Sequence, residues 1–147
     1  MTDSHDNELA AVLHDRGQRV TPQRIAIARA LRRLDRHASA EDVAHAVAPE
    51  LPHVSMPAVY ATLELLAELG FARRLTVAPG AVLYDPHTDD HHHAVCTRCG
   101  RVVDVTAPLD PGPAFRSARG HGFEPERAEL VVSGVCGDCR AVVSEPA

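Results

Sequence analysis

Apolar residues recur at helical spacing along four segments in the first half of the chain, and helix-capping residues separate these segments. The four helices that this pattern predicts span residues 7–16, 22–34, 39–49 and 55–69. Thr21, Ser39 and Ser55 each stand where a side-chain oxygen can cap the first turn of a helix. Gly17 and Gly70 follow the first and fourth segments, as glycine does at helix ends. The first half is therefore expected to be mainly helical.

After Gly70 the pattern changes to two short apolar runs, residues 71–75 and 81–84, with a turn expected at Pro79 and Gly80. Several short helices followed by a hairpin are typical of a winged helix-turn-helix, whose recognition helix enters the major groove of DNA. The fourth helix would be that element, presenting Ser55, Ala58, Tyr60, Ala61 and Thr62. Helical bundles without a DNA-binding function share the pattern, so that alternative stays open.

The composition argues against a membrane protein. The chain has 147 residues, which allows one ordinary domain or two small ones. Apolar residues make up 45% of it and aromatic residues 3%, so a core would be built from Ala, Val and Leu. No apolar run approaches the roughly 18 residues that a membrane span needs, and the acidic N-terminus has no apolar stretch behind it. We therefore expect a soluble, cytoplasmic protein with no membrane contact.

The net charge of −5 is unevenly distributed along the chain. Residues 16–36 hold seven arginines against one acid, Asp35, whereas residues 85–147 hold ten acids against six arginines, a net charge of −4. Because local rather than total charge decides contact with phosphates, the basic segment favours DNA binding. A solvated helix face is the alternative interpretation.

The four cysteines form two Cys-x-x-Cys pairs, Cys96 with Cys99 and Cys136 with Cys139. In a cytoplasmic chain such pairs favour metal binding over disulfides. Two pairs close a tetrahedral site of the structural zinc type, with no open position for chemistry. The 36 residues between the pairs predict a small folded insert, and a dithiol redox pair is the alternative.

A second group of possible metal ligands lies just before the first cysteine pair. Its members are Asp85, His87, Asp89, Asp90, His91, His92 and His93, all within nine positions. In an extended segment His91 and His93 share one face, and a hairpin about the cysteine pair would place Asp104 opposite His91 on that face. Asp85 and one distant histidine would complete a nitrogen-and-carboxylate set that suits Fe(II), Mn(II) or Zn(II). A solvated polar loop is the alternative.

Motifs along residues 9–140 resemble those of the ferric uptake regulator family and occur in the family's order. They are Thr21-Pro22-Gln23-Arg24, His37-Ala38-Ser39-Ala40-Glu41-Asp42, Val59-Tyr60 with Thr62-Leu63, His91-His92-His93 before Cys96-x-x-Cys99-Gly100, and Gly134-Val135-Cys136-x-x-Cys139. The resemblance implies an α+β fold in which an N-terminal winged helix-turn-helix domain, residues 1–84, precedes a small α/β dimerisation domain, residues 85–147, with a structural zinc. It also implies a homodimeric repressor that binds palindromic double-stranded operator DNA when a regulatory metal is loaded.

Carried over residue by residue, the resemblance assigns three sets of functional positions. The structural zinc (Zn2+) ligands would be Cys96, Cys99, Cys136 and Cys139. The ligands of a regulatory Fe2+ or Mn2+ would be His37, Asp85, His91, His93 and Asp104. The DNA-binding positions would be Arg19, Gln23, Arg24, Ser55, Ala58, Tyr60 and Thr62. One ion tied to both domains would bias their relative orientation towards the DNA-competent dimer.

The aspartates at 85 and 104 resemble those of the family's peroxide-sensing branch. In that branch hydrogen peroxide is the signal: bound Fe2+ reacts with it, and a ligand histidine is oxidised. By similarity the oxidised residues would be His37 and His91. Three short segments, residues 59–60, 89–93 and 127–129, also resemble actinobacterial members associated with catalase-peroxidase genes. Regulators of iron or zinc uptake that respond to metal level alone are the alternative.

Two positions depart from the family's pattern. Ala61 stands where an arginine usually follows the recognition-helix tyrosine, so one phosphate or guanine contact is expected to be missing. Ala128 stands where many members have a histidine of a further metal site, so we do not expect that third site.

Two other classes of protein fit parts of the sequence. A metalloenzyme would use His91, His93 and Asp104 as a facial triad that activates water or oxygen. Against it, the sequence offers no convincing general base or substrate cleft, and the capped helices would go unexplained. A zinc-storage protein would use the histidine run as a sink and would have no operator preference. We therefore predict a regulator and not an enzyme.

Overall fold

The structure is a computed structural model that describes residues 3–77 and 80–143, and the chain forms two compact units. The first unit ends at Thr88 and the second begins at Asp89. Asp85, which we expected to open the second domain, instead ends a strand of the first unit. Among the described residues, no helix is long and apolar enough to cross a membrane.

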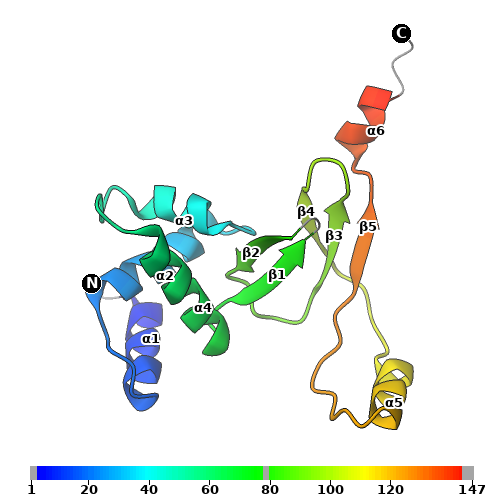
Figure 1. Cartoon of the computed structure of the whole chain (residues 1–147), viewed down its shortest axis with the longest axis horizontal. Helices are drawn as coiled ribbons and strands as arrows, with labels where there is room; N and C mark the ends of the chain where they lie inside the picture. The colour runs from blue at the N-terminus through cyan, green and yellow to red at the C-terminus, as the bar shows by residue number, and fades with distance from the viewer. Residues whose placement is uncertain (1–2, 78–79, 144–147) are drawn as a thin grey trace. The chain divides into compact units, whose positions relative to one another are not determined.

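The first unit contains four helices and a two-stranded hairpin (Figure 1). Its elements are α1 (Ser4–Asp15), α2 (Pro22–Leu34), α3 (Ala40–Val47), α4 (Met56–Glu68), β1 (Arg73–Val77) and β2 (Ala81–Asp85). All four predicted helices and both strands are present. Helix α1 begins three residues earlier than predicted because the Asp3 side chain accepts a hydrogen bond from the His5 N–H and caps it. Pro79 of the predicted turn lies outside the described residues, whereas Gly80 has the positive φ of 104° that favours glycine.

The predicted helix caps form local hydrogen bonds. Thr21 Oγ1 accepts from the Arg24 N–H at 3.2 Å, and Ser55 Oγ accepts from the Ala58 N–H at 3.3 Å. Ser39 and Asp42 form both bonds of a capping box at 3.1 Å each. These helix starts are therefore determined by residues that lie within one turn of each other.

The hydrophobic core of the first unit is aliphatic, as the composition predicts, with one tyrosine. Its largest fully buried side chains are Leu9, Leu13, Ile27, Leu31, Val43, Val47, Val59, Leu63 and Tyr84. Ala38 and Tyr84 exchange two backbone hydrogen bonds, of 3.0 and 2.8 Å, which join β2 to the segment between α2 and α3. The Tyr84 hydroxyl donates to Glu64 of α4, and burial followed by this bond raises the pKa of Tyr84. The hairpin is thereby fixed against the helices.

A buried carboxylate anchors α1 to α2. Asp6 is 3% exposed, and its carboxylate forms ion pairs with two arginines of α2. Its Oδ2 atom lies 2.5 Å from Arg29 Nη2, and its Oδ1 atom lies 2.8 Å from Arg32 Nη2. Burial raises the pKa of Asp6, but the hydrogen bonds and charges of the two arginines outweigh burial and hold this pKa below its ordinary value of 3.8. Because the folded pKa lies below the unfolded one, the stabilisation is present above about pH 4 and is lost as the pH falls through the folded pKa.

We expect Asp6→Ala to lower the free energy of unfolding by about 1.5–3 kcal/mol, the range for hydrogen bonds to charged groups. The cost stays below that of breaking a fully buried ion pair because both arginine side chains can reach water, being 39% and 26% exposed. Urea unfolding at pH 7 measures the difference. Asp15→Ala, at an 80% exposed position of the same helix, is the matched control and should change little. Equal stability of the Asp6 variant and the wild type would contradict the anchor.

The second unit is a three-stranded sheet with two short helices. Its elements are β3 (His92–Cys96), β4 (Val102–Val105), α5 (Gly112–Gly120), β5 (Val131–Gly134) and α6 (Gly137–Val143). The strand order is β4-β3-β5, with β3 antiparallel to β4 and parallel to β5. Helices α5 and α6 lie at opposite ends of this sheet (Figure 1). The predicted insert between the cysteine pairs therefore supplies β4, α5 and β5.

The predicted register of the β3–β4 hairpin was wrong by two residues. Asp104 pairs with His93, not with His91, which precedes β3. The reason is the turn of residues 96–101, the cysteine knuckle, which closes with a 2.9 Å hydrogen bond from the Cys96 N–H to the Arg101 carbonyl. Because the strands are antiparallel, three residues before Cys96 pair with three residues after Arg101, which sets His93 opposite Asp104. A shift of two residues preserves the face of a strand, so Asp104 still lies on the face of His93.

Candidate metal centres and DNA-binding surface

The four cysteines meet at one end of the second unit's sheet. Cys96 ends β3, Cys99 lies in the knuckle after it, Cys136 follows β5, and Cys139 belongs to α6. Their sulfur atoms lie within 4.8 Å of one another, and the Cys99 and Cys136 sulfurs are 3.7 Å apart. Four thiolates at the zinc–sulfur distance of about 2.3 Å have sulfur–sulfur separations of roughly 3.8 Å in a tetrahedron. All four are free cysteines, so the group fits zinc and not a disulfide.

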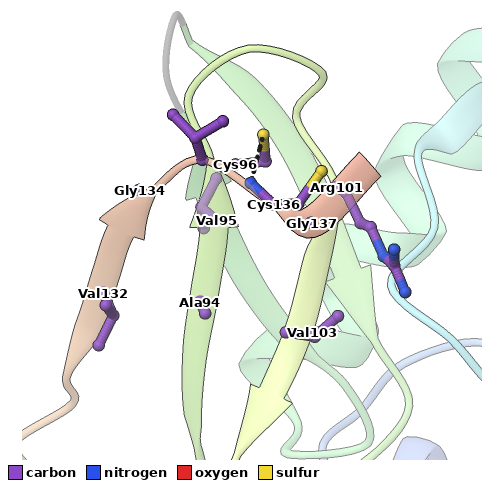
Figure 2. Close-up of a pocket in the computed structure, with 10 residues that line it drawn as sticks. Ala94, Val95, Cys96, Arg101, Val103, Val132, Gly134, Cys136 and Gly137 are labelled. Carbon is purple, nitrogen blue, oxygen red and sulfur yellow. Dashed lines mark hydrogen bonds between the residues drawn. The ribbon is translucent and has the colours of Figure 1, made fainter. Parts of the chain in front are cut away.

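The electrostatics of this cluster also favour a cation. Backbone N–H groups of Cys136 and Cys99 lower the pKa of Cys96 to about 5, and the first of these bonds measures 3.3 Å (Figure 2). Hydrogen bonds with the sulfurs of Cys136 and Cys99, followed by burial, raise the pKa of Cys139 to about 12. Four thiolates this close repel one another unless a divalent cation balances them. The donor set therefore fits a structural zinc ion.

Three predicted regulatory ligands lie together in the second unit. His91 precedes β3, His93 lies within it, and Asp104 is on β4. The Oδ1 atom of Asp104 is 3.6 Å from His91 Nε2 and 3.9 Å from His93 Nε2. The His91 and His93 side chains are 12% and 1% exposed. Two imidazoles and one carboxylate are thus held within coordination reach of one point, as strand alternation predicted.

Glu129 is a neighbour of this cluster to which the sequence analysis gave no role. Its Oε1 atom lies 2.7 Å from His93 Nδ1, and Arg127 lies 3.8 Å from its other oxygen. Glu129 lies 36 residues after His93 in the sequence. The parallel pairing of His93 with Val131 brings Glu129, two residues before Val131, next to His93. Only that register could have indicated the contact, because no local motif links the two residues.

The other two predicted ligands, His37 and Asp85, form a pair within the first unit. His37 Nε2 lies 3.1 Å from Asp85 Oδ2, and the two side chains are 10% and 0% exposed. The antiparallel bridge between Ala38 and Tyr84 explains the pairing, because the next residues outward are 37 and 85. Folding therefore brings a histidine and an aspartate 48 positions apart into contact.

The five predicted regulatory ligands thus form two groups, a pair in the first unit and a cluster of three in the second. Each group combines imidazole nitrogen with carboxylate oxygen, donor types that Fe(II), Mn(II) and Zn(II) accept. The chemistry of the donors therefore fits a regulatory metal.

Helix α4 presents only part of the surface that we predicted for DNA. Tyr60 is 41% exposed, and its hydroxyl donates to Glu41 at 3.1 Å. Ser55 caps the helix, and Ala58 is partly exposed. Thr62 is 5% exposed, so its side chain offers little surface for the DNA contact that we predicted.

The basic segment is less available to DNA than its composition indicated. Four of its seven arginines form ion pairs with acids of the same unit. These arginines are Arg29, Arg32, Arg33 and Arg36, and their partners are Asp3, Asp6, Asp42 and Glu50. Within the part of the chain that the structure describes, Arg16, Arg19 and Arg24 form no ion pair. Arg16 caps the end of α1, and Arg19 and Arg24 lie near the start of α2 beside the exposed Gln23. These three arginines are the charges of the segment that remain for phosphates.

Comparison with known proteins identifies the protein family to which this chain belongs. A sequence profile of the ferric uptake regulator family matches residues 15–133. The chain belongs to the ferric uptake regulator family. As a member of that family it is a metal-dependent transcription regulator, and the metalloenzyme alternative is excluded.

Individual relatives of this ferric uptake regulator family member include two peroxide regulators. The chain is 30% identical to the peroxide-responsive repressor PerR of Staphylococcus epidermidis, over 94% of both chains. It is 33% identical to the peroxide operon regulator of Bacillus subtilis, over 90% of this chain and 91% of that one. The structure of the ferric uptake regulator of Helicobacter pylori superposes with a TM-score of 0.76 at 19% identity, covering 91% and 90% of the two chains, which shows the shared fold.

Proposed function

We propose that this regulator is a homodimeric repressor that senses hydrogen peroxide. In this proposal it binds operator DNA when one Fe2+ or Mn2+ is held by His37, Asp85, His91, His93 and Asp104. The observation that carries the proposal is the donor set: three imidazoles and two aspartates, in one group within each unit. Relatives that are named for peroxide response support the choice of signal.

The division of the ligands between the units supports a switch based on orientation. An ion that binds donors of both units restrains how the units sit relative to each other. It favours DNA binding to the extent that it binds the DNA-competent arrangement more tightly than the others. A coupling of 1–3 kcal/mol, or about 5–150-fold in affinity, is typical of such linkage.

Peroxide would act on the ligand histidines. Iron, when bound, supplies the redox chemistry that reduces peroxide beside an imidazole. The imidazole gives up two electrons and one C–H bond becomes C–O, while hydrogen peroxide leaves as water, so the residue gains one oxygen atom. His37 and His91 are the more accessible ligand imidazoles at 10% and 12% exposure, against 1% for His93. An oxidised ring is a poorer ligand, so metal and DNA would be released.

An open apolar face of the second unit supports the homodimer. Eight of the ten exposed large apolar side chains among the described residues belong to this unit. Ala94, Val103 and Val132 of neighbouring strands line a hollow of about 390 Å³ on one face of the sheet, beside Cys96 and Cys136 (Figure 2). Val103 is 41% and Val132 is 45% exposed. Strand β5 is also an edge strand of this sheet. A second copy of the chain that packs here would bury both the apolar face and the edge of β5.

The peroxide proposal predicts a response that depends on which metal is bound. Operator binding is measured by fluorescence anisotropy on zinc-replete protein, with DNA from upstream of its own gene, in three states: no added metal, Mn(II), and anaerobic Fe(II). We expect both metals to induce binding. A low dose of peroxide should then abolish binding of the iron form only, with a one-oxygen mass gain in the peptide of His37 or His91.

The manganese form is the matched control, because it should bind DNA without supporting the oxidation. Binding that follows metal but ignores peroxide would instead identify a regulator of iron or zinc uptake. Binding that is the same in all three metal states would contradict the regulatory site itself.

A further inference from the structure

The carboxylate of Asp85 is fully buried, and its two oxygens face different partners. Oδ2 lies 3.1 Å from His37 Nε2. Oδ1 accepts a hydrogen bond from the His87 backbone N–H at 2.9 Å and lies 3.2 Å from His87 Nδ1. The backbone bond from residue i+2 is an Asx turn, which folds the chain after β2 so that the His87 ring returns over Asp85.

The His87 ring is itself held from its other side. Its Nε2 atom lies 2.9 Å from Oδ1 of Asp35, the residue that caps the C-terminus of α2. Asp35 has a φ of +50°, the left-handed region that few residues other than glycine, asparagine and aspartate adopt. A conformation of this kind persists only where its surroundings hold it. Asp35, His87 and Asp85 therefore form a chain of side chains from the end of α2 to a buried carboxylate, within the first unit.

We propose that His87 is a positioning residue for the regulatory metal site, which it serves by holding Asp85 Oδ1 so that Oδ2 is the oxygen presented to the ion. Asp35 in turn holds His87. This inference rests on the proposed function, because it requires Asp85 to be a metal ligand. Partners of this kind orient ligating side chains and tune their basicity, and their loss typically weakens metal affinity by about 10–100-fold.

Replacement of the His87 ring separates this role from folding. In His87→Ala the backbone bond to Asp85 remains but the ring contact is lost. In His87→Asn the side-chain nitrogen takes the position of Nδ1 and keeps the contact with Asp85. Asp35→Gly removes the outer carboxylate at a position whose left-handed backbone glycine adopts without strain.

The test is Mn(II) binding to the zinc-loaded full chain, followed by the electron paramagnetic resonance signal of free Mn(II). We expect His87→Ala to weaken Mn(II) affinity by about 10–100-fold with zinc content and melting temperature unchanged. His87→Asn should recover most of the loss, and Asp35→Gly should lose less than His87→Ala. His91→Ala, which removes a proposed ligand, is measured in parallel.

If His87→Ala binds Mn(II) like the wild type while His91→Ala does not, the positioning role is wrong and the proposed function stands. If His91→Ala also binds like the wild type, the proposed function itself fails. A His87→Asn variant as weak as His87→Ala would overturn the hydrogen-bonding role. A loss of zinc or of thermal stability in His87→Ala would assign the residue to the fold and overturn the proposal as well.

Discussion

Replacing Cys96 by serine is expected to release zinc and to unfold the second unit. Cys96 is the most buried of the four cysteines, and backbone N–H groups stabilise its thiolate. The second unit has almost no hydrophobic core of its own: among the described residues, its buried apolar side chains are Val95 and Cys96. The main core cluster lies wholly in the first unit. Structural zinc contributes roughly 10–16 kcal/mol of apparent binding free energy, which a core of this size cannot replace.

Three measurements check this result: zinc content by a colorimetric chelator, dimer mass by sedimentation, and operator affinity with Mn(II) present. All three should be lost in Cys96→Ser. Asp138→Ser is the matched control, because Asp138 lies between Cys136 and Cys139 but its side chain is 90% exposed. A Cys96→Ser protein that remains a stable, DNA-binding dimer would rule out the structural-zinc assignment.

Replacing His91 by alanine is expected to abolish metal-dependent DNA binding while leaving zinc and the dimer intact. His91 precedes β3 and contributes nothing to the strand pairing, so its removal deletes one donor near Asp104 without disturbing the sheet. Operator affinity with Mn(II) should fall to that of the metal-free protein, a loss of about 5–150-fold. Anisotropy titrations with and without Mn(II) measure the loss.

His92→Ala tests whether the metal response depends on the face of β3 on which a histidine lies. His92 lies on the opposite face of β3 from His93, and its Nδ1 accepts a hydrogen bond from the Leu130 N–H. Its loss should lower the melting temperature slightly and keep the Mn(II) response. If His91→Ala still represses with a normal dependence on Mn(II), the regulatory site is misplaced.

The features that the sequence predicted well are those set by neighbouring residues. The caps at Thr21, Ser39 and Ser55 act within one helical turn, and the two cysteine pairs carry their ligand spacing in four residues each. Alternation along an extended segment was enough to place His91 and His93 on one side.

The errors arose where distant segments meet. The hairpin register depended on how the cysteine knuckle closes, which the spacing of residues does not state. Glu129 reaches His93 through a parallel strand, and His87 reaches Asp35 across more than fifty positions. Thr62 is different, because it lies three residues after Val59 and four before Leu66, so the helical spacing did contain the signal for its burial.

The arginine pairing was hidden for a related reason. Asp6 and Glu50 lie outside the segment whose charge was counted, and folding places them on its arginines. Local charge in sequence was therefore a poor guide to local charge in space.

The hydrogen bond between Tyr60 and Glu41 has a consequence for the proposed binding of DNA by α4. A phosphate that approaches the tyrosine hydroxyl must displace a carboxylate that already occupies it and repels the incoming charge. Four arginines of the basic segment are likewise paired with acids of the same unit. In the proposed DNA complex, a phosphate at Tyr60 would therefore take the place of Glu41 and would not add a contact to an open hydroxyl. In the proposed complex, a site that also offers matched base edges therefore gains more from this exchange than arbitrary sequence does.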